Sequence, residues 1–260
     1  MAGAPAPELY SLLQQRAASD ARVARVLFGL SWTVVELDNG ACGLCFSPTG
    51  APRDIPWAGE LAGRPVSAML DWLRSDHPCE MAAAVASVNA VLNFESFSER
   101  VSGASTPTRL LCDAAPHLAV FEHFADQLAG ARVAIVGRYP GMQRFAGRFD
   151  YQCIERRPGP GDLPEDAAAS VLPASDWVFV TASSIANGTA PQLLELARAA
   201  RVVLMGPSLA WMPDWARFGV DYLAGVQVRD ASALRQIVAE AGGTRIFRDA
   251  LAYQLVRVTG

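Results

Sequence analysis

Short apolar runs alternate with helical segments along the second half of the chain. The runs lie at residues 132–136, 151–155, 177–181, 201–205 and 222–228, and helical spacing is clearest at 191–200 and 231–241. Apolar strands that alternate with helices form βαβ units, which wind right-handed into a parallel sheet. The pattern predicts a Rossmann-like α/β domain. The final segment is ambiguous, since residues 247–251 favour a helix and residues 254–258 favour a strand.

The first part of the chain begins with an amphipathic helix, predicted over residues 7–18, and continues with a hairpin. Residues 23–37 and 41–46 have strand character, and Asp38-Asn39-Gly40 between them suits a turn that needs positive φ. A short helix is expected over residues 66–74.

A longer helix is predicted from Pro78, because proline fits the first turn of a helix. Met81, Val85, Val88 and Leu92 recur at helical spacing and predict one buried face. The first part ends near Ser105-Thr106-Pro107. We therefore expect a smaller α+β domain over residues 1–108, followed by the α/β domain over residues 109–260.

Composition narrows the classes of partner and compartment. The 260 residues are 51% hydrophobic and 18% charged with a net charge of −4, which argues against nucleic-acid binding. No apolar run reaches the roughly 18 residues that span a bilayer, and no secretory signal opens the chain, so we expect a cytoplasmic protein without membrane contact. The oligomeric state is open, with a homodimer as the default for a soluble oligomer.

The five cysteines are scattered, which predicts reduced thiols that pack as small hydrophobic side chains. Cys42 and Cys45 have the spacing of a chelating pair. On a strand, however, residues three apart point to opposite faces, so packing is the preferred interpretation. Cys153 is assigned to the core. His77 and Cys79 flank Pro78, and a metal there would need two further ligands.

The ends of the predicted parallel strands carry the candidate chemistry, because ligands of such sheets bind beyond the carboxyl ends of the strands. These ends are Gly137-Arg138-Tyr139-Pro140-Gly141, Glu155, residues 181–189 and Gly206-Pro207-Ser208. The glycines match a dinucleotide fingerprint only in part, because Tyr139 and Pro140 fill the space of the second glycine. We do not expect a conventional NAD site. Glu155 is either a ribose-type acid or a carboxylate paired with Arg138 or Arg156.

Residues 181–189 give the strongest local signal. Thr181, Ser183, Asn187 and Thr189 could bind an anion or carboxylate together with free N–H groups at the start of the next helix. Alternatively, Asn187-Gly188 is a turn and Thr189 an N-cap.

Two further polar positions have alternative interpretations. Gly206-Pro207-Ser208 either presents Ser208 or only reverses the chain. Asn89 lies beside an apolar helix face and either pins the hairpin or faces a cleft between the two parts. The sequence does not support a Ser-His-Asp triad, because no histidine lies near a Gly-x-Ser-x-Gly elbow.

The order of these motifs resembles that of the DUF364 family over about residues 8–256. This is a family of unknown function that carries the label of a heavy-metal chelation domain. The first part resembles its companion, the DUF4213 domain with an enolase-N-terminal-like fold, with Asn89-Ala90 at the matching helix. The resemblance implies a site between the two parts. This chain departs from the family pattern at Ser183-Ser184 and at Leu209-Ala210-Trp211. Its matched motifs hold few of the Cys and His ligands that soft metals prefer.

The candidate ligand-binding residues are Gly137, Arg138, Tyr139, Pro140, Glu155, Thr181, Ser183, Asn187, Gly188, Thr189, Gly206, Pro207, Ser208 and Asn89. We expect them to bind a metal ion, a metal chelate or a carboxylate-bearing small molecule. The alternatives are an enzyme for a small polar or nucleotide-like substrate, with Glu155 as the candidate acid or base, and a non-catalytic assembly module. A metal ion is the one cofactor class that the sequence keeps open.

Overall fold

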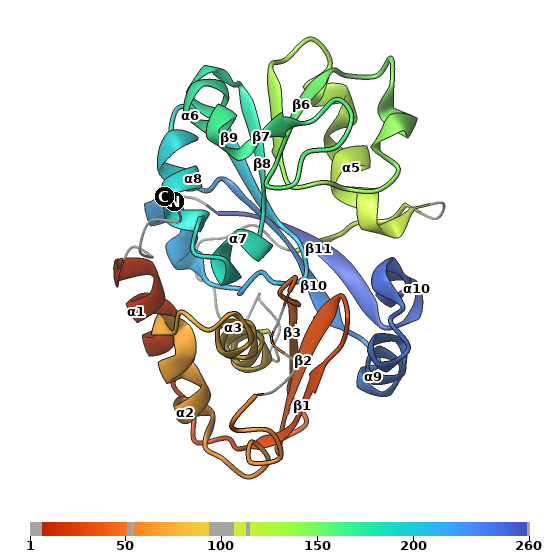
Figure 1. Ribbon diagram of the computed structural model, residues 1–260. Coiled ribbons are helices and arrows are strands. Elements are labelled where there is room, and N and C mark those ends of the chain that lie inside the picture. Colours follow the sequence, from red (N-terminus) through yellow and green to blue (C-terminus); the bar gives the residue numbers. More distant parts are fainter. Residues whose placement is uncertain (1–6, 51, 53–54, 94–106, 113–114, 259–260) are drawn as a thin grey trace.

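A computed structural model describes residues 7–50, 52, 55–93, 107–112 and 115–258 of the chain. Two sheets form the framework, a small one in the first part and a large one in the second (Figure 1). No helix within the described ranges has the length and apolar character needed to cross a membrane.

The first part is a three-stranded antiparallel sheet with helices packed on it. Its strands are β1 (Val23–Phe28), β2 (Trp32–Leu37) and β3 (Cys42–Phe46), in the order β1-β2-β3. Its helices are α1 (Pro7–Arg16), α2 (Val66–Leu70), the 3₁₀ turn Asp71–Arg74 and α3 (Pro78–Leu92). Helix α3 lies directly on β3, where a Cβ at Gly43 would stand 2.1 Å from the Ala90 backbone nitrogen. Only glycine allows this helix and strand to approach so closely.

The second part is an eight-stranded sheet in the order β4-β11-β10-β9-β8-β5-β6-β7. The strands are β4 (Thr108–Arg109), β5 (Val133–Val136), β6 (Tyr151–Glu155), β7 (Leu163–Pro164), β8 (Trp177–Thr181), β9 (Arg201–Met205), β10 (Tyr222–Val228) and β11 (Leu251–Arg257). Neighbours from β7 to β10 pair in parallel, whereas β11 pairs antiparallel with both β10 and β4.

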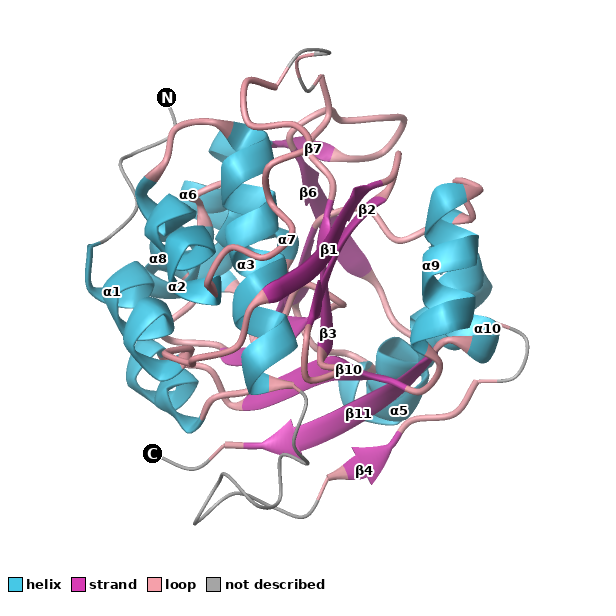
Figure 2. Cartoon of the chain, turned by 90° about the horizontal axis from the view of Figure 1, so that it is seen from below, coloured by secondary structure: helices cyan, strands magenta, loops and turns pink. Residues whose placement is uncertain are grey.

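Helices cover both faces of this large sheet (Figure 2). They are α5 (Ala119–Leu128), α6 (Ala168–Val171), α7 (Ser183–Ala186), α8 (Ala190–Leu196), α9 (Ala231–Ala239) and α10 (Ile246–Asp249). Short 3₁₀ segments connect them at Pro116–Leu118, Met142–Phe145, Glu165–Ala167, Leu172–Ala174, Pro213–Phe218 and Gly243–Arg245. Alternate residues of β8 enter different cores: Val178 and Val180 face α8, and Trp177 and Phe179 face α5. This double burial explains the continuous apolar runs of the sequence.

The chain order of the parallel strands creates a switch point. Strands β5 and β8 are neighbours in space, and from β5 the chain proceeds to β6 on one side and to β8 on the other. Open α/β sheets bind ligands at the crevice that such a reversal leaves at the carboxyl ends of the strands. The ends of β5 and β8 are therefore the first place to look for a site.

The two parts share a buried seam as well as a cleft. One hydrophobic core contains residues of both, including Leu9, Val35, Val178 and Leu204. The Tyr10 hydroxyl of α1 donates a hydrogen bond of 2.6 Å to the carbonyl oxygen of Ile185 in α7. Such buried contacts hold the two parts as one packed unit rather than two hinged lobes.

The structure confirms the predicted α/β class and refines it in three places. Residues 23–37 form two antiparallel strands rather than one, because the chain turns at Gly29, whose N–H donates to the Trp32 carbonyl. Helix α3 is buried on nearly all sides rather than on one face, because the small sheet and α7 both pack against it. The ambiguous end of the chain forms α10 followed by the antiparallel strand β11.

The boundary between residues 108 and 109 stays a prediction. Residues 105 and 106, near which we expected the first part to end, lie outside the described residues. Thr108 and Arg109 both pair with β11 in the large sheet.

Candidate functional site

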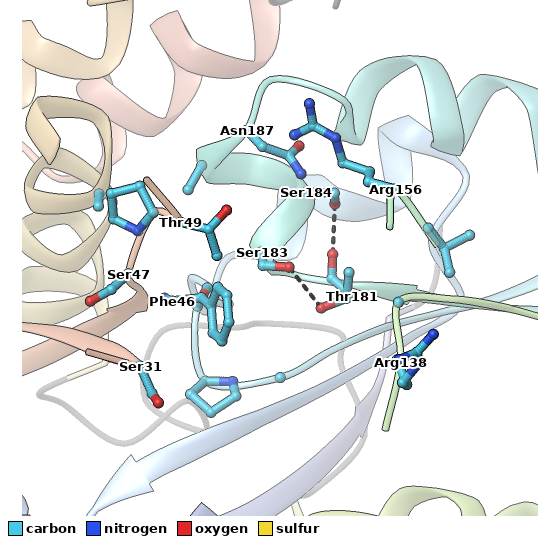
Figure 3. A pocket seen from close by; sticks show the side chains of 18 of the residues that line it. Ser31, Phe46, Ser47, Thr49, Arg138, Arg156, Thr181, Ser183, Ser184 and Asn187 are labelled. Carbon is cyan, nitrogen blue, oxygen red and sulfur yellow. Dashed lines mark hydrogen bonds between the residues drawn. The ribbon is translucent and has the colours of Figure 1, made fainter. Parts of the chain in front are cut away.

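A cavity of about 1030 Å³ lies between the two parts, at the carboxyl ends of the parallel strands. One wall comes from the first part and includes Phe46, Ser47 and Thr49, and the other includes Ser183 and Asn187 of the second part (Figure 3). The cavity is lined by thirteen of the fourteen predicted residues: Gly137, Arg138, Tyr139, Pro140, Glu155, Thr181, Ser183, Asn187, Gly188, Thr189, Gly206, Pro207 and Ser208. The four strand exits therefore converge, although whether each residue binds a ligand stays a prediction.

The switch point is closed by a glycine. Gly137 follows β5 with a φ of +99°, and a Cβ there would lie 2.9 Å from the Thr181 methyl carbon at the end of β8. Only glycine combines this backbone conformation with this approach. Gly137 thus lets β5 and β8 end side by side, with Thr181 in the lining of the cavity.

Glu155 connects two strand exits through its carboxylate. One oxygen accepts the Arg138 backbone N–H at 2.9 Å, and the other accepts the Arg156 backbone N–H at 2.9 Å. A carboxylate used in this way holds the β5 and β6 exits together. The alternative in which Glu155 pairs with Arg138 or Arg156 is realised through their backbones rather than their guanidinium groups.

The Arg138 side chain pairs with the loop that follows β6. Its Nε donates to Asp162 at 2.9 Å, and its Nη2 also reaches this carboxylate. The guanidinium lies against Gly159, where any Cβ would clash with it. Arg138 therefore shapes the cavity wall, while Arg156 and Arg157, also in the lining, are exposed.

Tyr139 brings a buried phenol to the same place. Among the described residues, no atom meets the distance and angle of a hydrogen bond to its hydroxyl. Burial raises the pKa of Tyr139, so the phenol stays protonated near neutral pH and remains a donor. The Thr181 hydroxyl is nevertheless close enough to offset part of this rise in the pKa of the phenol. A buried donor without an acceptor is costly unless a ligand or water satisfies it.

Residues 181–189 differ from the predicted open loop. Residues 183–186 form the helical turn α7, and the Ser184 hydroxyl donates back to the Thr181 carbonyl at 2.6 Å. The Thr181 and Ser183 hydroxyls are 3.0 Å apart and share one hydrogen bond. Thr189 is the N-cap of α8, as one alternative predicted, but its side chain does not cap the helix.

The amide of Asn187 is oriented by Thr189. Its Oδ1 accepts both the Thr189 backbone N–H at 3.1 Å and the Thr189 hydroxyl at 2.7 Å. These two donors identify the oxygen and therefore place the NH₂ group on the other side. That NH₂ group makes no hydrogen bond within the described part of the chain, so its two N–H donors are available to a ligand.

Ser208 joins the two walls instead of facing a ligand alone. Its hydroxyl accepts the Phe46 backbone N–H at 2.9 Å, across the boundary between the parts. Gly206 before it has a φ of +120°, which makes the reversal after β9. Both alternatives for this segment are therefore partly realised, since the chain reverses and Ser208 is presented to the opposite wall.

Asn89 does not line the cavity. It is fully buried in α3, and its NH₂ group donates to the Leu44 carbonyl of β3 at 2.9 Å. The hairpin-pinning alternative is thus the one observed, and the cleft-facing one is wrong. Leu209-Ala210-Trp211, where the sequence departs from the family pattern, is buried outside the cavity lining. These residues therefore pack in the core rather than contact a ligand in this cavity.

Much of the lining was not predicted from the sequence, including Phe46, Asp76 and Tyr253. Phe46 ends a predicted strand, Asp76 precedes α3, and Tyr253 belongs to the segment whose structure was ambiguous. Phe46 and Tyr253 lie in strands among buried residues, and Asp76 lies in a short loop, so only the tertiary arrangement shows that they reach the cavity.

The described residues do not form a metal site on their own. They contain no group of three His, Cys, Asp or Glu residues placed to hold an ion, and none of the five cysteines lines the cavity. Cys42 and Cys45 enter different cores, as predicted, and burial raises the pKa of each thiol to about 12. These thiols stay protonated, whereas soft metals bind the thiolate.

Two protein-family models match the two parts of the chain. The DUF364 family model, described as "Putative heavy-metal chelation", matches residues 119–257, and the DUF4213 model, with the same description, matches residues 10–92.

The chain belongs to the DUF364 family.

A crystal structure of a DUF364 protein of unknown function from Desulfitobacterium hafniense is 25% identical, with a TM-score of 0.79 over 95% of this chain and 96% of that one. A second, from Pyrococcus horikoshii, is 23% identical, with a TM-score of 0.75 over 96% and 100%. An uncharacterized protein of Methanocaldococcus jannaschii is 25% identical over 127 residues, which is 46% of this chain. The match covers 49% of that relative, so it spans about half of the relative's length.

Proposed function

We propose that the cavity of this DUF364 protein binds a small carboxylate-bearing molecule, either free or as a metal chelate. The observation that carries the proposal is a surplus of hydrogen-bond donors. The Asn187 NH₂ group and the Tyr139 phenol lack acceptors among the described residues, and the Arg157 guanidinium has no ion-pair partner there. Carboxylate oxygens accept from all three kinds of donor, and pairs with arginine are the strongest.

The donor set does not suit a bare heavy metal. Arginine repels a cation and an amide N–H offers it no lone pair, and no cysteine lies in the described lining to bind a soft metal. A chelate solves this problem, because its organic part presents outward carboxylate oxygens while it holds the metal. This agrees with the family description and requires no metal ligand from the chain.

A second candidate function is an enzyme for a nucleotide-like substrate. The switch point between β5 and β8 favours it, because sheets of this strand order bind nucleotide cofactors there. In this case Glu155 is a positioning residue, because both of its oxygens already accept backbone N–H groups.

The proposal is tested by isothermal titration calorimetry with malate, citrate and isophthalate, with citrate mixed with Zn²⁺, and with Zn²⁺ alone. We expect at least one carboxylate to bind, and Arg157→Gln and Asn187→Asp to weaken it about tenfold or more. Arg229→Gln, an exposed arginine outside the cavity, is the control and leaves the affinity unchanged. Binding of Zn²⁺ alone with no binding of any carboxylate contradicts the proposal, and so does carboxylate binding that ignores both cavity variants.

A further inference from the structure

Phe46 is exposed within the cavity. It ends β3 and keeps 42% of its surface accessible, as one of three large hydrophobic side chains that are exposed among the described residues. Leu30 and Leu111, the other two, lie outside the cavity lining. Along β3, Cys42 and Leu44 point into the same core as Trp32, and Phe46 continues this face beyond the core into the hollow.

The Phe46 ring is held in place from two sides. Trp32 is its cross-strand partner on β2, and the two rings meet edge to face with centroids 5.5 Å apart. The Phe46 backbone N–H donates to the Ser208 hydroxyl of the second part. The strand and this hydrogen bond fix the Phe46 backbone, and Trp32 packs against the ring, so the ring offers a preorganised flat surface that lowers the entropic cost of stacking.

Polar donors lie across the hollow from this ring. Figure 3 shows Phe46 and Thr49 on one wall, and Thr181, Ser183, Asn187 and Arg156 on the other. A molecule between these walls meets an aromatic face on one side and N–H and O–H donors on the other. A saturated acid would satisfy the donors but leave the aromatic face without a matching surface.

We infer that the ligand contains a planar aromatic or conjugated ring that stacks on Phe46, with its acidic groups directed toward Asn187, Arg156 and Arg157. This inference rests on the proposed carboxylate-binding function and adds the chemical class of the ligand. Ring stacking would distinguish aromatic from saturated acids, which carboxylate recognition alone does not. Offset aromatic rings attract each other with an energy beyond that of the apolar area that they bury.

The test compares isophthalate with cis-cyclohexane-1,3-dicarboxylate, two dianions that share the 1,3 placement of their carboxylates and differ in aromaticity. We expect the wild-type protein to bind isophthalate about three- to ten-fold more tightly in calorimetric titrations. Phe46→Leu should abolish this preference, and Phe46→Tyr should keep it. Leu111→Ala, an exposed hydrophobic residue outside the cavity, is the matched control and should keep the preference as well.

The outcomes separate this inference from the proposed function. Equal binding of both diacids to the wild-type protein, or a preference that persists in Phe46→Leu, overturns the stacking role and leaves carboxylate binding intact. Failure of the wild-type protein to bind either diacid, while citrate or malate binds, also overturns it. Failure of every carboxylate to bind contradicts the proposed function itself.

Discussion

The two edges of the parallel sheet differ in the hydrogen-bond donors that they leave without an acceptor. At the amino edge, the Asp176 carboxylate at the start of β8 accepts the backbone N–H and the guanidinium of Arg132, before β5. Nearby, Asp221 accepts the Val202 backbone N–H at 2.8 Å. At the carboxyl edge, the Tyr139 phenol and the Asn187 NH₂ group have no acceptor among the described residues. Paired groups stabilise the fold, and the unpartnered donors at the carboxyl edge are the groups that the proposed ligand would satisfy.

The largest effect is expected at the switch point. Gly137→Ala should lower the free energy of unfolding by about 2–4 kcal/mol, because it adds a strained positive φ to a clash with Thr181. Gly147→Ala is the matched control: its φ is +80°, but nothing lies within 4 Å of the added Cβ. The control should cost only about 1–2 kcal/mol in urea denaturation. Equal losses would show that the close approach of β5 and β8 carries no energy.

The next effect concerns the carboxylate that connects two strand exits. Glu155→Gln should cost about 1–2 kcal/mol, because glutamine offers one acceptor oxygen where two backbone N–H groups need acceptors. Glu165→Gln removes an exposed carboxylate 3.4 Å from Arg156 and should cost less than about 0.5 kcal/mol. Urea midpoints of the two variants decide the matter. An unchanged midpoint for Glu155→Gln would free this carboxylate for a catalytic role.

A pair of tyrosines tests spare capacity directly. Tyr10→Phe removes a hydroxyl that donates to Ile185 and should cost about 1 kcal/mol, because the carbonyl loses its 2.6 Å hydrogen bond and keeps only the longer one from the Gly188 N–H at 3.3 Å. Tyr139→Phe removes a phenol without an acceptor among the described residues and should leave the stability unchanged or raise it slightly. Thermal unfolding without ligand measures both variants. A loss at Tyr139 equal to that at Tyr10 would mean that the phenol is already satisfied in the folded protein.

The smallest effect belongs to the amino edge and depends on pH. Hydrogen bonds from Arg132 lower the pKa of Asp176 from 3.8 to about 2. A carboxyl group with a lowered pKa stabilises the folded state above its unfolded pKa and loses this contribution as the pH falls through the folded value. The small stability difference between the wild type and Asp176→Asn at pH 7 should therefore shrink between about pH 4 and pH 2. A difference that stays constant over this range would contradict the pairing.

The sequence predicts the framework well because burial leaves a strong pattern. The β5, β6, β8, β9 and β10 runs are apolar because both faces of the sheet are covered, and their exits are rich in glycine and hydroxyl groups. It does not predict which donors remain free. Asn187 and Ser208 look alike in sequence as small polar residues after strands, yet Ser208 is used across the seam and the Asn187 NH₂ group is not. That distinction depends on partners far along the chain.

The antiparallel edge and the break at Gly29 show the same limit. Strand β11 pairs antiparallel with both β10 and β4, and no local pattern in its own residues encodes this direction. Residues 23–37 are predicted as one strand. The turn at Gly29 is recognised only from the pairing of β2 with both β1 and β3 in the structure.

Native mass spectrometry of the protein purified from its own host tests the central claim most directly. Wild-type protein should carry an organic anion, alone or with a metal, and the Asn187→Asp/Arg157→Gln double variant should lose that mass while it stays folded. A bare metal ion bound equally to both proteins, with no organic molecule, would contradict the account.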